Sequence, residues 1–324
     1  MAEAALNDKK VGWVGAGRMG QRLASRLLDA GYELAVYNRT RAKAEPLAEI
    51  GATLVDSPAD LANRDIVFTI VAGPDDFRDV VCGESGLLSE VGCAPGIIVD
   101  ATTVSPSASA AVRQVAERRG ADLLAAPVSG NPKVVDAGLL TMVVSGPQHA
   151  YERARPYLDL LAPRGVAYVG EGERARLVKV CHNVMLGVVA QCLAEITVLA
   201  EKGGISRADF LSFLNGSVMG SMFTRYKTPA YVNLDFTPMF TPDLLVKDFD
   251  LGFEAARAHG VPMPVAAAAA ELVRSLPGYG YADVDFAALL ELEARASGLD
   301  LEPENVPVSD GLESALNPQP GVTA

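Results

Sequence analysis

The sequence predicts an α/β domain followed by an all-α domain, joined by one long helix. Two patterns carry this prediction. In the first half of the chain, short apolar strands alternate with helical segments, as in a parallel sheet covered by helices on both faces. After Val169 no segment shows the two-residue alternation of a strand, and helical periodicity dominates. A chain of 324 residues is also long enough for two domains.

The composition restricts the expected partners and location. The net charge is −12 and no basic run compensates it, so we expect neither nucleic acid nor an anionic membrane as a partner. The chain starts without an apolar signal segment, and apolar stretches such as residues 261–270 are short and interrupted by proline. The four cysteines form no CxxC pair, which favours a cytoplasmic protein with reduced thiols. The three histidines show no metal-binding spacing, so no metal site is expected.

The first strand, VGWVG within residues 9–15, runs directly into a glycine-rich turn that opens a helix. The turn has the spacing GxGxxG and consists of Gly15, Ala16, Gly17, Arg18, Met19 and Gly20. Gly15 allows the tight turn, Gly17 lets a pyrophosphate approach the backbone, and Gly20 lets helix and strand pack closely. Between a strand and a helix, and before a second strand at residues 32–37, this spacing predicts a Rossmann domain that binds a dinucleotide.

The end of the second strand distinguishes the two nicotinamide cofactors. An NAD site usually places a carboxylate there, which bonds the ribose 2′-hydroxyl. This chain has Asn38, Arg39 and Thr40 instead. An arginine can bind a 2′-phosphate and no carboxylate is present to repel it, so NADP(H) is favoured over NAD(H).

The strands at residues 65–71 and 97–100 are predominantly apolar, and the loops after them are expected at the cofactor. We assign Val71 and Ala72 to the nicotinamide side of the cofactor site. Thr103 lies at the next strand end, whereas Thr102 is expected to cap the helix that follows Pro106.

A proline- and glycine-rich turn follows, with Ser129, Gly130 and Asn131 at its centre. Its hydroxyl and backbone N–H groups can bind an anion, although an ordinary structural turn is equally compatible with the residues. A strand at 140–144, a helix at 147–161 and a strand at 166–169 complete the first domain, residues 1–172.

Residues 173–202 form a long helix with apolar side chains in nearly every direction, so we expect it to be buried all round. Lys179 and Asn183 share one face because they are four residues apart. A lysine in apolar surroundings must be paired, solvated or functional, and we assign Lys179 a function. His182 is expected to be a packed, hydrogen-bonded histidine.

The second domain, residues 173–300, contains further helices at 207–214, 243–259, 265–276 and 282–296. The helix at 243–259 carries Lys247 and Asp248, of which we interpret Asp248 as structural. Residues 301–324 are acidic and rich in proline, and we expect a loosely held or disordered tail.

These motifs, from GWVGAGRMG through NRT, DATTV, APVSGN and GEGERARLVKVCHN to LLVKDFDLG, resemble those of the β-hydroxyacid dehydrogenases over residues 9–297. The NRT, VPMPVAAAA and VDFAALLE segments are most similar to the glyoxylate/succinic semialdehyde reductase branch. The resemblance implies a Rossmann domain, an all-α domain and an inter-domain helix. It also implies a homodimer or homotetramer.

The resemblance implies a role for individual residues. Lys179 matches the family's catalytic lysine, Asn183 its asparagine and Lys247 its second lysine. Ser129 and Gly130 match the turn that binds a substrate carboxylate. Two positions depart from the family pattern: Asn131 replaces a second glycine, and His182 precedes the asparagine.

The expected activity is NADPH-dependent reduction of a small carboxylated aldehyde, or oxidation of a 3-hydroxyacid in reverse. Two alternatives stay open. One is an imine reductase-like enzyme, although that group typically carries Asp or Tyr in place of Lys179. The other is a catalytically silent NADP-binding protein, in which the lysine would typically be lost.

Overall fold

The computed structural model describes residues 10–312. The chain divides into two compact units, Met1–Lys179 and Val180–Ala324. The division falls inside helix α7 (Arg174–Lys202), one and a half turns after the helix begins. Each unit is therefore built around one part of the same helix.

The first unit contains a six-stranded, fully parallel sheet with the order β3-β2-β1-β4-β5-β6. Its strands are β1 (Val11–Val14), β2 (Leu34–Tyr37), β3 (Thr53–Leu54), β4 (Ile66–Thr69), β5 (Ile97–Asp100) and β6 (Asp122–Ala125). The strand order reverses direction at β1, so the carboxyl ends of β1 and β4 flank the position where such sheets bind ligands. The predicted parallel sheet is confirmed.

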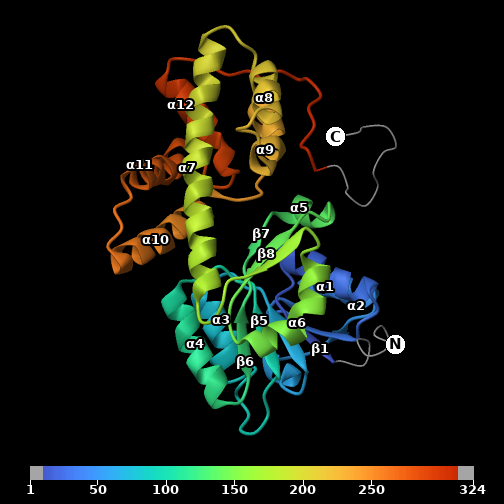
Figure 1. Cartoon of the computed structure of the whole chain (residues 1–324). Coiled ribbons are helices and arrows are strands. Elements are labelled where there is room, and N and C mark those ends of the chain that lie inside the picture. Colours follow the sequence, from blue (N-terminus) through green and yellow to red (C-terminus); the bar gives the residue numbers. More distant parts are fainter. Residues whose placement is uncertain (1–9, 313–324) are drawn as a thin grey trace. The chain divides into compact units, whose positions relative to one another are not determined.

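Helices cover both faces of this sheet, with α3 and α4 on one side and α1 and α6 on the other (Figure 1). The helices are α1 (Arg18–Asp29), α2 (Glu45–Glu49), α3 (Pro74–Cys82), α4 (Pro106–Arg118), α5 (Pro132–Asp136) and α6 (Gln148–Leu161), with 3-10 turns at Arg41–Lys43 and Pro58–Leu61. A smaller sheet joins β7 (Val128–Ser129), β8 (Thr141–Val144) and β9 (Gly165–Tyr168). The strand at β8 was predicted, but its antiparallel partner β7 was not, because two residues are too few to show a period.

The described residues of the second unit form helices and connecting loops, without a strand. After α7 come α8 (Arg207–Gly216), α9 (Met222–Asn233), α10 (Pro242–His259), α11 (Pro264–Ser275) and α12 (Leu289–Ala296), with 3-10 turns at Leu276–Tyr279 and Phe286–Ala288. The predicted helix at 282–296 begins later than expected. Helix α9 was missed because Pro229 interrupts its pattern, although Ser221 and Thr224 form a capping box at its start.

The prediction that the long helix is buried all round is wrong. Along α7, Val178 is 44% exposed, Met185 68% and Leu199 73%, and Cys181 and Cys192 are exposed on the same side. These residues recur at helical spacing, so α7 carries one exposed apolar stripe. Among the described residues, α7 alone has the length and composition of a membrane span, but half of the relevant window is buried inside the protein. Because the core helix of a soluble protein passes the same test, this is weak evidence for a membrane.

Helices α7 and α10 approach each other closely at two glycines. A Cβ atom on Gly252 would lie 2.3 Å from Cγ2 of Val184, and one on Gly187 would lie 2.4 Å from Cζ of Phe249. Real Cβ atoms do not approach other heavy atoms this closely, so both positions need glycine. The close approach brings residues of α10 within hydrogen-bonding distance of α7.

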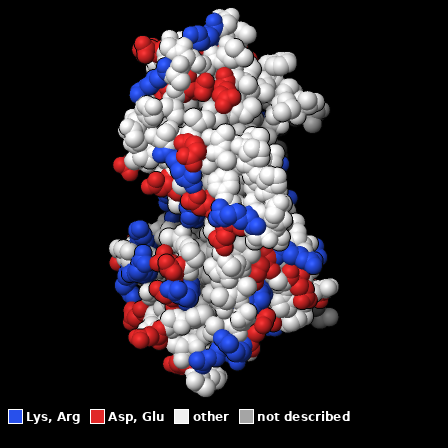
Figure 2. Space-filling view, turned by 90° about the vertical axis from the view of Figure 1, so that its left-hand side faces the viewer, with Lys and Arg blue, Asp and Glu red and all other residues white. Residues whose placement is uncertain are grey.

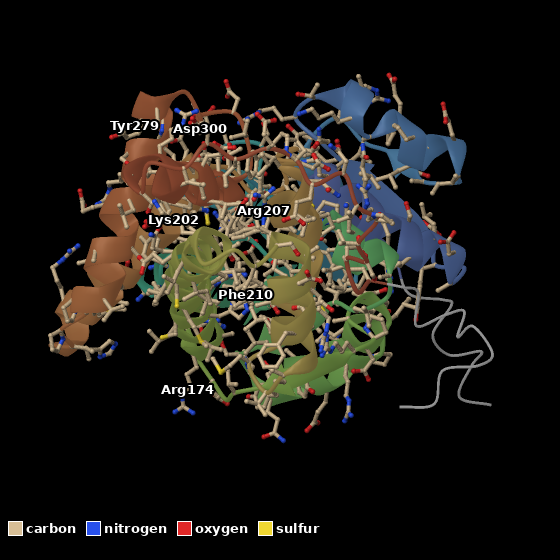
Figure 3. All side chains as sticks on the ribbon, turned by 90° about the horizontal axis from the view of Figure 1, so that it is seen from above. Arg174, Lys202, Arg207, Phe210, Tyr279 and Asp300 are labelled. Atoms are coloured by element: carbon tan, nitrogen blue, oxygen red, sulfur yellow. The ribbon has the colours of Figure 1, made fainter. Side chains whose placement is uncertain are left out.

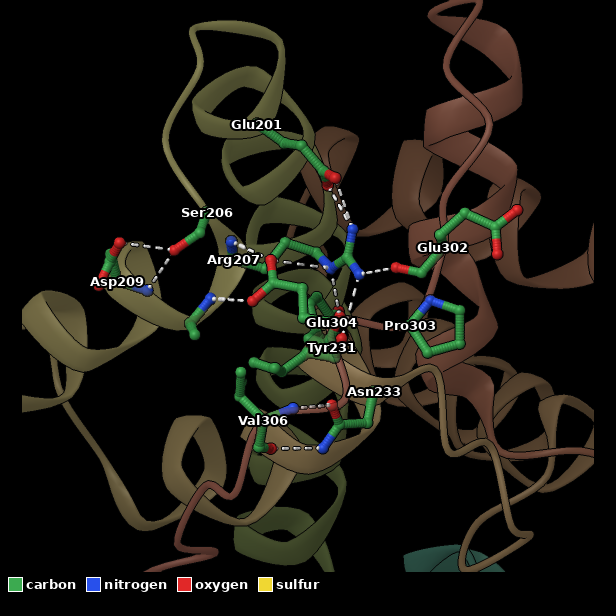
Figure 4. A network of polar contacts seen from close by, with 12 residues as sticks. Glu201, Ser206, Arg207, Asp209, Tyr231, Asn233, Glu302, Pro303, Glu304 and Val306 are labelled. Carbon is green, nitrogen blue, oxygen red and sulfur yellow. Dashed lines mark hydrogen bonds and ion pairs between the residues drawn. The ribbon is translucent and has the colours of Figure 1, made fainter.

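The chain beyond α12 is bound to the second unit, which corrects the expected loose tail as far as residue 312. The buried guanidinium of Arg207 donates to the carbonyls of Tyr231, Val232 and Glu302, and it pairs with Glu201 at 2.6 Å (Figures 3 and 4). Glu304 accepts from the backbone N–H groups of Arg207 and Ala208, at 2.6 and 3.1 Å. Residues 313–324 of the predicted tail lie outside the described part of the chain. The acidic, proline-rich composition of the segment suggested disorder, but its backbone and carboxylates satisfy a buried arginine and a helix N-terminus.

Candidate active site

The glycine turn after β1 has the geometry that its spacing predicts. Gly15 has φ +102°, and a Cβ on it would lie 2.1 Å from the carbonyl oxygen of Ile70. A Cβ on Gly20 would lie 2.0 Å from the carbonyl oxygen of Gly15, whereas nothing lies within 4 Å of one on Gly17. Gly17 is also the N-cap of α1, and no side chain caps the N–H groups there. The turn thus leaves space for a pyrophosphate at the N-terminus of α1, beside Arg18 and Met19.

The side chains after β2 have different partners. Asn38 accepts from the N–H of Ala16 at 2.8 Å and donates to the carbonyl of Thr40 at 2.7 Å, so it ties the glycine turn to the end of β2. Arg39 is 80% exposed and pairs with Asp76 at 2.6 Å. An exposed ion pair contributes only about 0–1 kcal/mol, so a 2′-phosphate can compete with Asp76 for this arginine.

The end of β5 contains a buried polar network. Asp100 accepts from the hydroxyls of Thr69 and Thr102, at 2.6 and 2.7 Å, and Thr102 in turn accepts from the N–H of Val71 at 3.1 Å. The expected capping role of Thr102 is therefore wrong: Ser105 caps α4 by accepting from Ala108. Thr102 instead joins the loops after β4 and β5, where Val71, Ala72 and Thr103 were assigned to the cofactor.

The turn between β7 and α5 combines a strained backbone with a helix cap. Gly130 has φ +148°, and a Cβ there would lie 2.7 Å from Val134 and 2.8 Å from Leu140. Asn131 is the N-cap of α5 and accepts from the N–H of Val134 at 3.0 Å. Asn131, in place of the family's second glycine, thus caps α5. The hydroxyl of Ser129 and the N–H of Gly130 lie at the turn itself.

Lys179 and Asn183 lie one helical turn apart on α7, Lys179 half-buried and Asn183 buried. The amide nitrogen of Asn183 donates to Oδ2 of Asp248 at 2.5 Å, and its oxygen lies 2.8 Å from Nδ1 of His182. His182 is therefore hydrogen-bonded as predicted, but its side chain is exposed rather than packed. Lys247 lies 3.5 Å from Oδ1 of Asp248.

Asp248, which the sequence analysis interpreted as structural, contacts the candidate residue Asn183, and this contact was not predicted. It is only 2% exposed and orients the amide of Asn183. The signal was present in α10, whose buried face consists of Pro242, Leu245, Asp248, Phe249, Gly252 and Ala256. A carboxylate on an otherwise apolar helical stripe must have a buried partner, and only the structure identifies that partner.

Two protein-family models cover nearly the whole chain. One describes the NAD-binding domain of 6-phosphogluconate dehydrogenase and matches residues 10–170; the other describes the NAD-binding region of NADP-dependent 3-hydroxyisobutyrate dehydrogenase and matches residues 173–292. The chain belongs to the β-hydroxyacid dehydrogenase family. Its activity class follows from this membership: it is an NAD(P)-dependent oxidoreductase that acts on hydroxyl or carbonyl groups.

Individual family members are similar over most of their length. Glyoxylate/succinic semialdehyde reductase 2 of Arabidopsis thaliana is 30% identical over 287 residues, 88% of this chain and 80% of the relative. The structure of 3-hydroxyisobutyrate dehydrogenase from Salmonella typhimurium has a TM-score of 0.78 at 26% identity, covering 88% and 100% of the two chains. The Mycobacterium tuberculosis enzyme, solved with L-serine, has a TM-score of 0.76 at 28% identity, covering 88% and 98%.

The glycine turn fits the nicotinamide dinucleotide that this family uses, since its backbone donors and open approach at Gly17 suit a pyrophosphate. Within residues 10–312, no cluster of three or more His, Cys, Asp or Glu side chains suits a metal ion. Figure 2 shows basic and acidic side chains interspersed on the face drawn, without a broad basic surface of the kind that binds nucleic-acid phosphates.

Proposed function

We propose that this protein is an NADPH-dependent reductase of a small carboxylated aldehyde, of the glyoxylate or succinic semialdehyde type, which in reverse oxidises a 3-hydroxyacid. The observation that carries the proposal is the pair on α7, a lysine one turn from an asparagine whose amide is oriented by a buried carboxylate. The similarity to the Arabidopsis reductase supports the same substrate class.

Reduction of an aldehyde adds a hydride to the carbonyl carbon and a proton to the oxygen. The bound reduced nicotinamide supplies the hydride. The ammonium group of Lys179 donates the proton and stabilises the developing alkoxide, which leaves a neutral amine. Asn183 donates one amide N–H to Asp248. Its second N–H binds the substrate oxygen, or its carbonyl oxygen accepts from the ammonium group of the lysine. Thus Asp248 fixes the direction of the amide.

The substrate carboxylate is assigned to the hydroxyl of Ser129, the N–H of Gly130 and the hydroxyl of Thr103, which lies in the loop after β5. Asn131 supports this turn by capping α5 rather than by contributing a further donor. The structure of the Mycobacterium tuberculosis relative with L-serine supports a small carboxylate as ligand. Lys247 is assigned to the cofactor side and is held by Asp248.

A preference for NADP(H) over NAD(H) is supported by the residues after β2. Arg39 is exposed, and no carboxylate follows Tyr37 to bond a ribose 2′-hydroxyl. The cytoplasm is the proposed location, in keeping with four free cysteines.

A homodimer or homotetramer is proposed because α7 carries the exposed apolar stripe. Monomeric proteins rarely leave a long apolar stripe in water, and a second copy presents the same stripe. Substitution of Met185 by Asp should lower the molar mass measured by light scattering. An unchanged molar mass would show that the stripe is not the interface between copies.

The test of function is NADPH oxidation with glyoxylate, succinic semialdehyde, methylmalonate semialdehyde, tartronate semialdehyde and one cyclic imine. We expect turnover of a carboxylated aldehyde, and a loss of about two to three orders of magnitude in kcat for Lys179→Ala. Lys202→Ala, an exposed lysine at the far end of the same helix, is the control and should keep full activity. Turnover of the imine alone, or an active Lys179→Ala enzyme, would refute the proposal.

A further inference from the structure

A second residue of α7, Arg176, makes a set of contacts that its position in the sequence did not suggest. Its side chain is fully buried in the first unit. Nη2 donates to Oδ2 of Asp100 at 2.6 Å, Nη1 to the carbonyl of Thr102 at 2.6 Å, and Nε to the hydroxyl of Ser109 at 3.1 Å. The guanidinium also lies 5.7 Å from the ring centre of Phe77. All three nitrogen atoms of the guanidinium therefore have an acceptor.

The acceptors of Arg176 belong to the network at the strand ends. Asp100 binds Arg176 through one oxygen and the hydroxyls of Thr69 and Thr102 through the other. Thr102 gives its carbonyl to Arg176 and accepts from the N–H of Val71 through its hydroxyl. A single buried guanidinium thus joins α7 to the loops after both β4 and β5.

These contacts fix the position of Lys179 within the first unit. Lys179 follows Arg176 by three residues, a rise of about 4.5 Å along a continuous helix. The helix is rigid over one turn, so anchoring Arg176 to the strand ends sets the distance from the Lys179 backbone to those loops. In sheets of this kind, the loops at the carboxyl ends of the strands bind the cofactor.

The contacts of Arg176 are better explained by the orientation they impose than by the stability they add. A buried ion pair often contributes no more net stability than well-packed apolar side chains would, because both charges lose their hydration. What the pair provides is direction: the planar guanidinium of an arginine presents its N–H donors in one rigid arrangement, whereas the ammonium of lysine is a compact charge with rotatable donors on a flexible stem. A fixed direction matters where a proton donor and a hydride donor must act on neighbouring atoms.

We propose that Arg176 is a positioning residue for the reductase reaction. It holds Lys179 in register with the loops at Val71–Ala72 and Thr102–Thr103, so that the proton and the hydride reach the same carbonyl group. The proposal rests on the proposed function of Lys179. It adds a residue whose contacts are to other residues of the protein and not to the substrate.

The test compares Arg176→Lys with Arg207→Lys in the full-length enzyme. Both arginines have fully buried side chains paired with a carboxylate, but Arg207 lies in the second unit with Glu201 as partner. For Arg176→Lys we expect kcat to fall by about 100-fold, since a displacement of about 1 Å can have that effect. The dissociation constant of NADPH should change less than threefold, because the glycine turn is untouched. The primary isotope effect with 4-deuterated NADPH should increase, because hydride transfer becomes slower.

The control variant separates positioning from general destabilisation. Arg207→Lys should lower the unfolding temperature but leave kcat and the isotope effect unchanged below that temperature. An Arg176→Lys enzyme with wild-type kcat and isotope effect would overturn the proposal, as would equal kcat losses in both variants. If Arg176→Lys does not fold, Thr102→Val decides in the same way, because it removes the bonds to Asp100 and Val71.

Hydrogen exchange provides a readout that needs no substrate. Arg176→Lys should speed amide exchange at residues 70–73, 101–104 and 176–180 together, whereas Arg207→Lys should not. Unchanged exchange rates in these segments would refute the proposal that Arg176 fixes α7 against the strand-end loops. A wild-type protein that reduces no aldehyde would refute the proposed function instead, so the two failures are distinguishable.

Discussion

Removal of the guanidinium of Arg207 tests whether the segment after α12 is a structural part of the second unit. In Arg207→Met, the carboxylate of Glu201 and the carbonyls of Tyr231, Val232 and Glu302 lose their buried donor. Breaking a buried charged pair by removing one partner costs about 3–5 kcal/mol. For a unit of this size, about 2–4 °C of unfolding temperature corresponds to each kcal/mol, so we expect a decrease of about 6–20 °C.

Scanning calorimetry measures this decrease directly, and Arg174→Met is the matched control. Arg174 is exposed, and its Nη1 atom lies 3.5 Å from the carbonyl oxygen of Val169. Its substitution should change stability by no more than about 0.5 kcal/mol. A decrease below about 2 °C for Arg207→Met would refute the reasoning, and would mean that residues 299–308 contribute little to the unit.

Three further predictions concern other parts of the chain. Gly252→Ala places a Cβ 2.3 Å from Val184, so it should lower the free energy of unfolding in urea by about 1–3 kcal/mol and lower kcat by separating Asp248 from Asn183. The control is Gly216→Ala, whose Cβ would have nothing within 4 Å and which should change neither quantity. Equal effects of the two variants would contradict the close-packing argument. Burial raises the pKa of Tyr157 to about 12, and its hydroxyl has no hydrogen-bond partner among the described residues. Since this folded-state pKa lies above the unfolded value of about 10, the stability that Tyr157 contributes is complete below pH 10 and is lost as the pH rises through 12. Tyr157→Phe should therefore have the unfolding temperature of the wild type at pH 7 and a higher one than the wild type at pH 11. Equal unfolding temperatures at pH 11 would show that ionisation of Tyr157 does not destabilise the fold. Arg39→Ala should lower kcat/KM for NADPH by about 10–100-fold, because one charge-assisted hydrogen bond is lost, and leave kcat/KM for NADH unchanged. An equal loss with both cofactors would rule out a contact between Arg39 and the 2′-phosphate.

The sequence by itself determined the features that depend on neighbouring residues. The glycine turn could be predicted because Gly15 must adopt a positive φ and Gly20 must approach a carbonyl oxygen closely. Both requirements arise within one strand and the helix that follows it. The apolar strands and the helical second half were likewise visible in the period of the chain. Lys179 and Asn183 were found together because one helix carries both.

Tertiary structure decided which polar side chains meet across the fold and which apolar faces are covered. Asp100 and Arg176 are 76 residues apart, and Asn183 and Asp248 are 65 apart, so no local pattern pairs them. The period of α7 shows apolar residues all round, but only packing shows that residues 10–312 leave Val178, Met185 and Leu199 exposed. The segment after α12 has the composition of a loose tail, yet Arg207 binds it. The physical reason is the same in each case: the free energy of burying a charge or an apolar face depends on the partner that the fold supplies, and a sequence pattern specifies only one side of that contact.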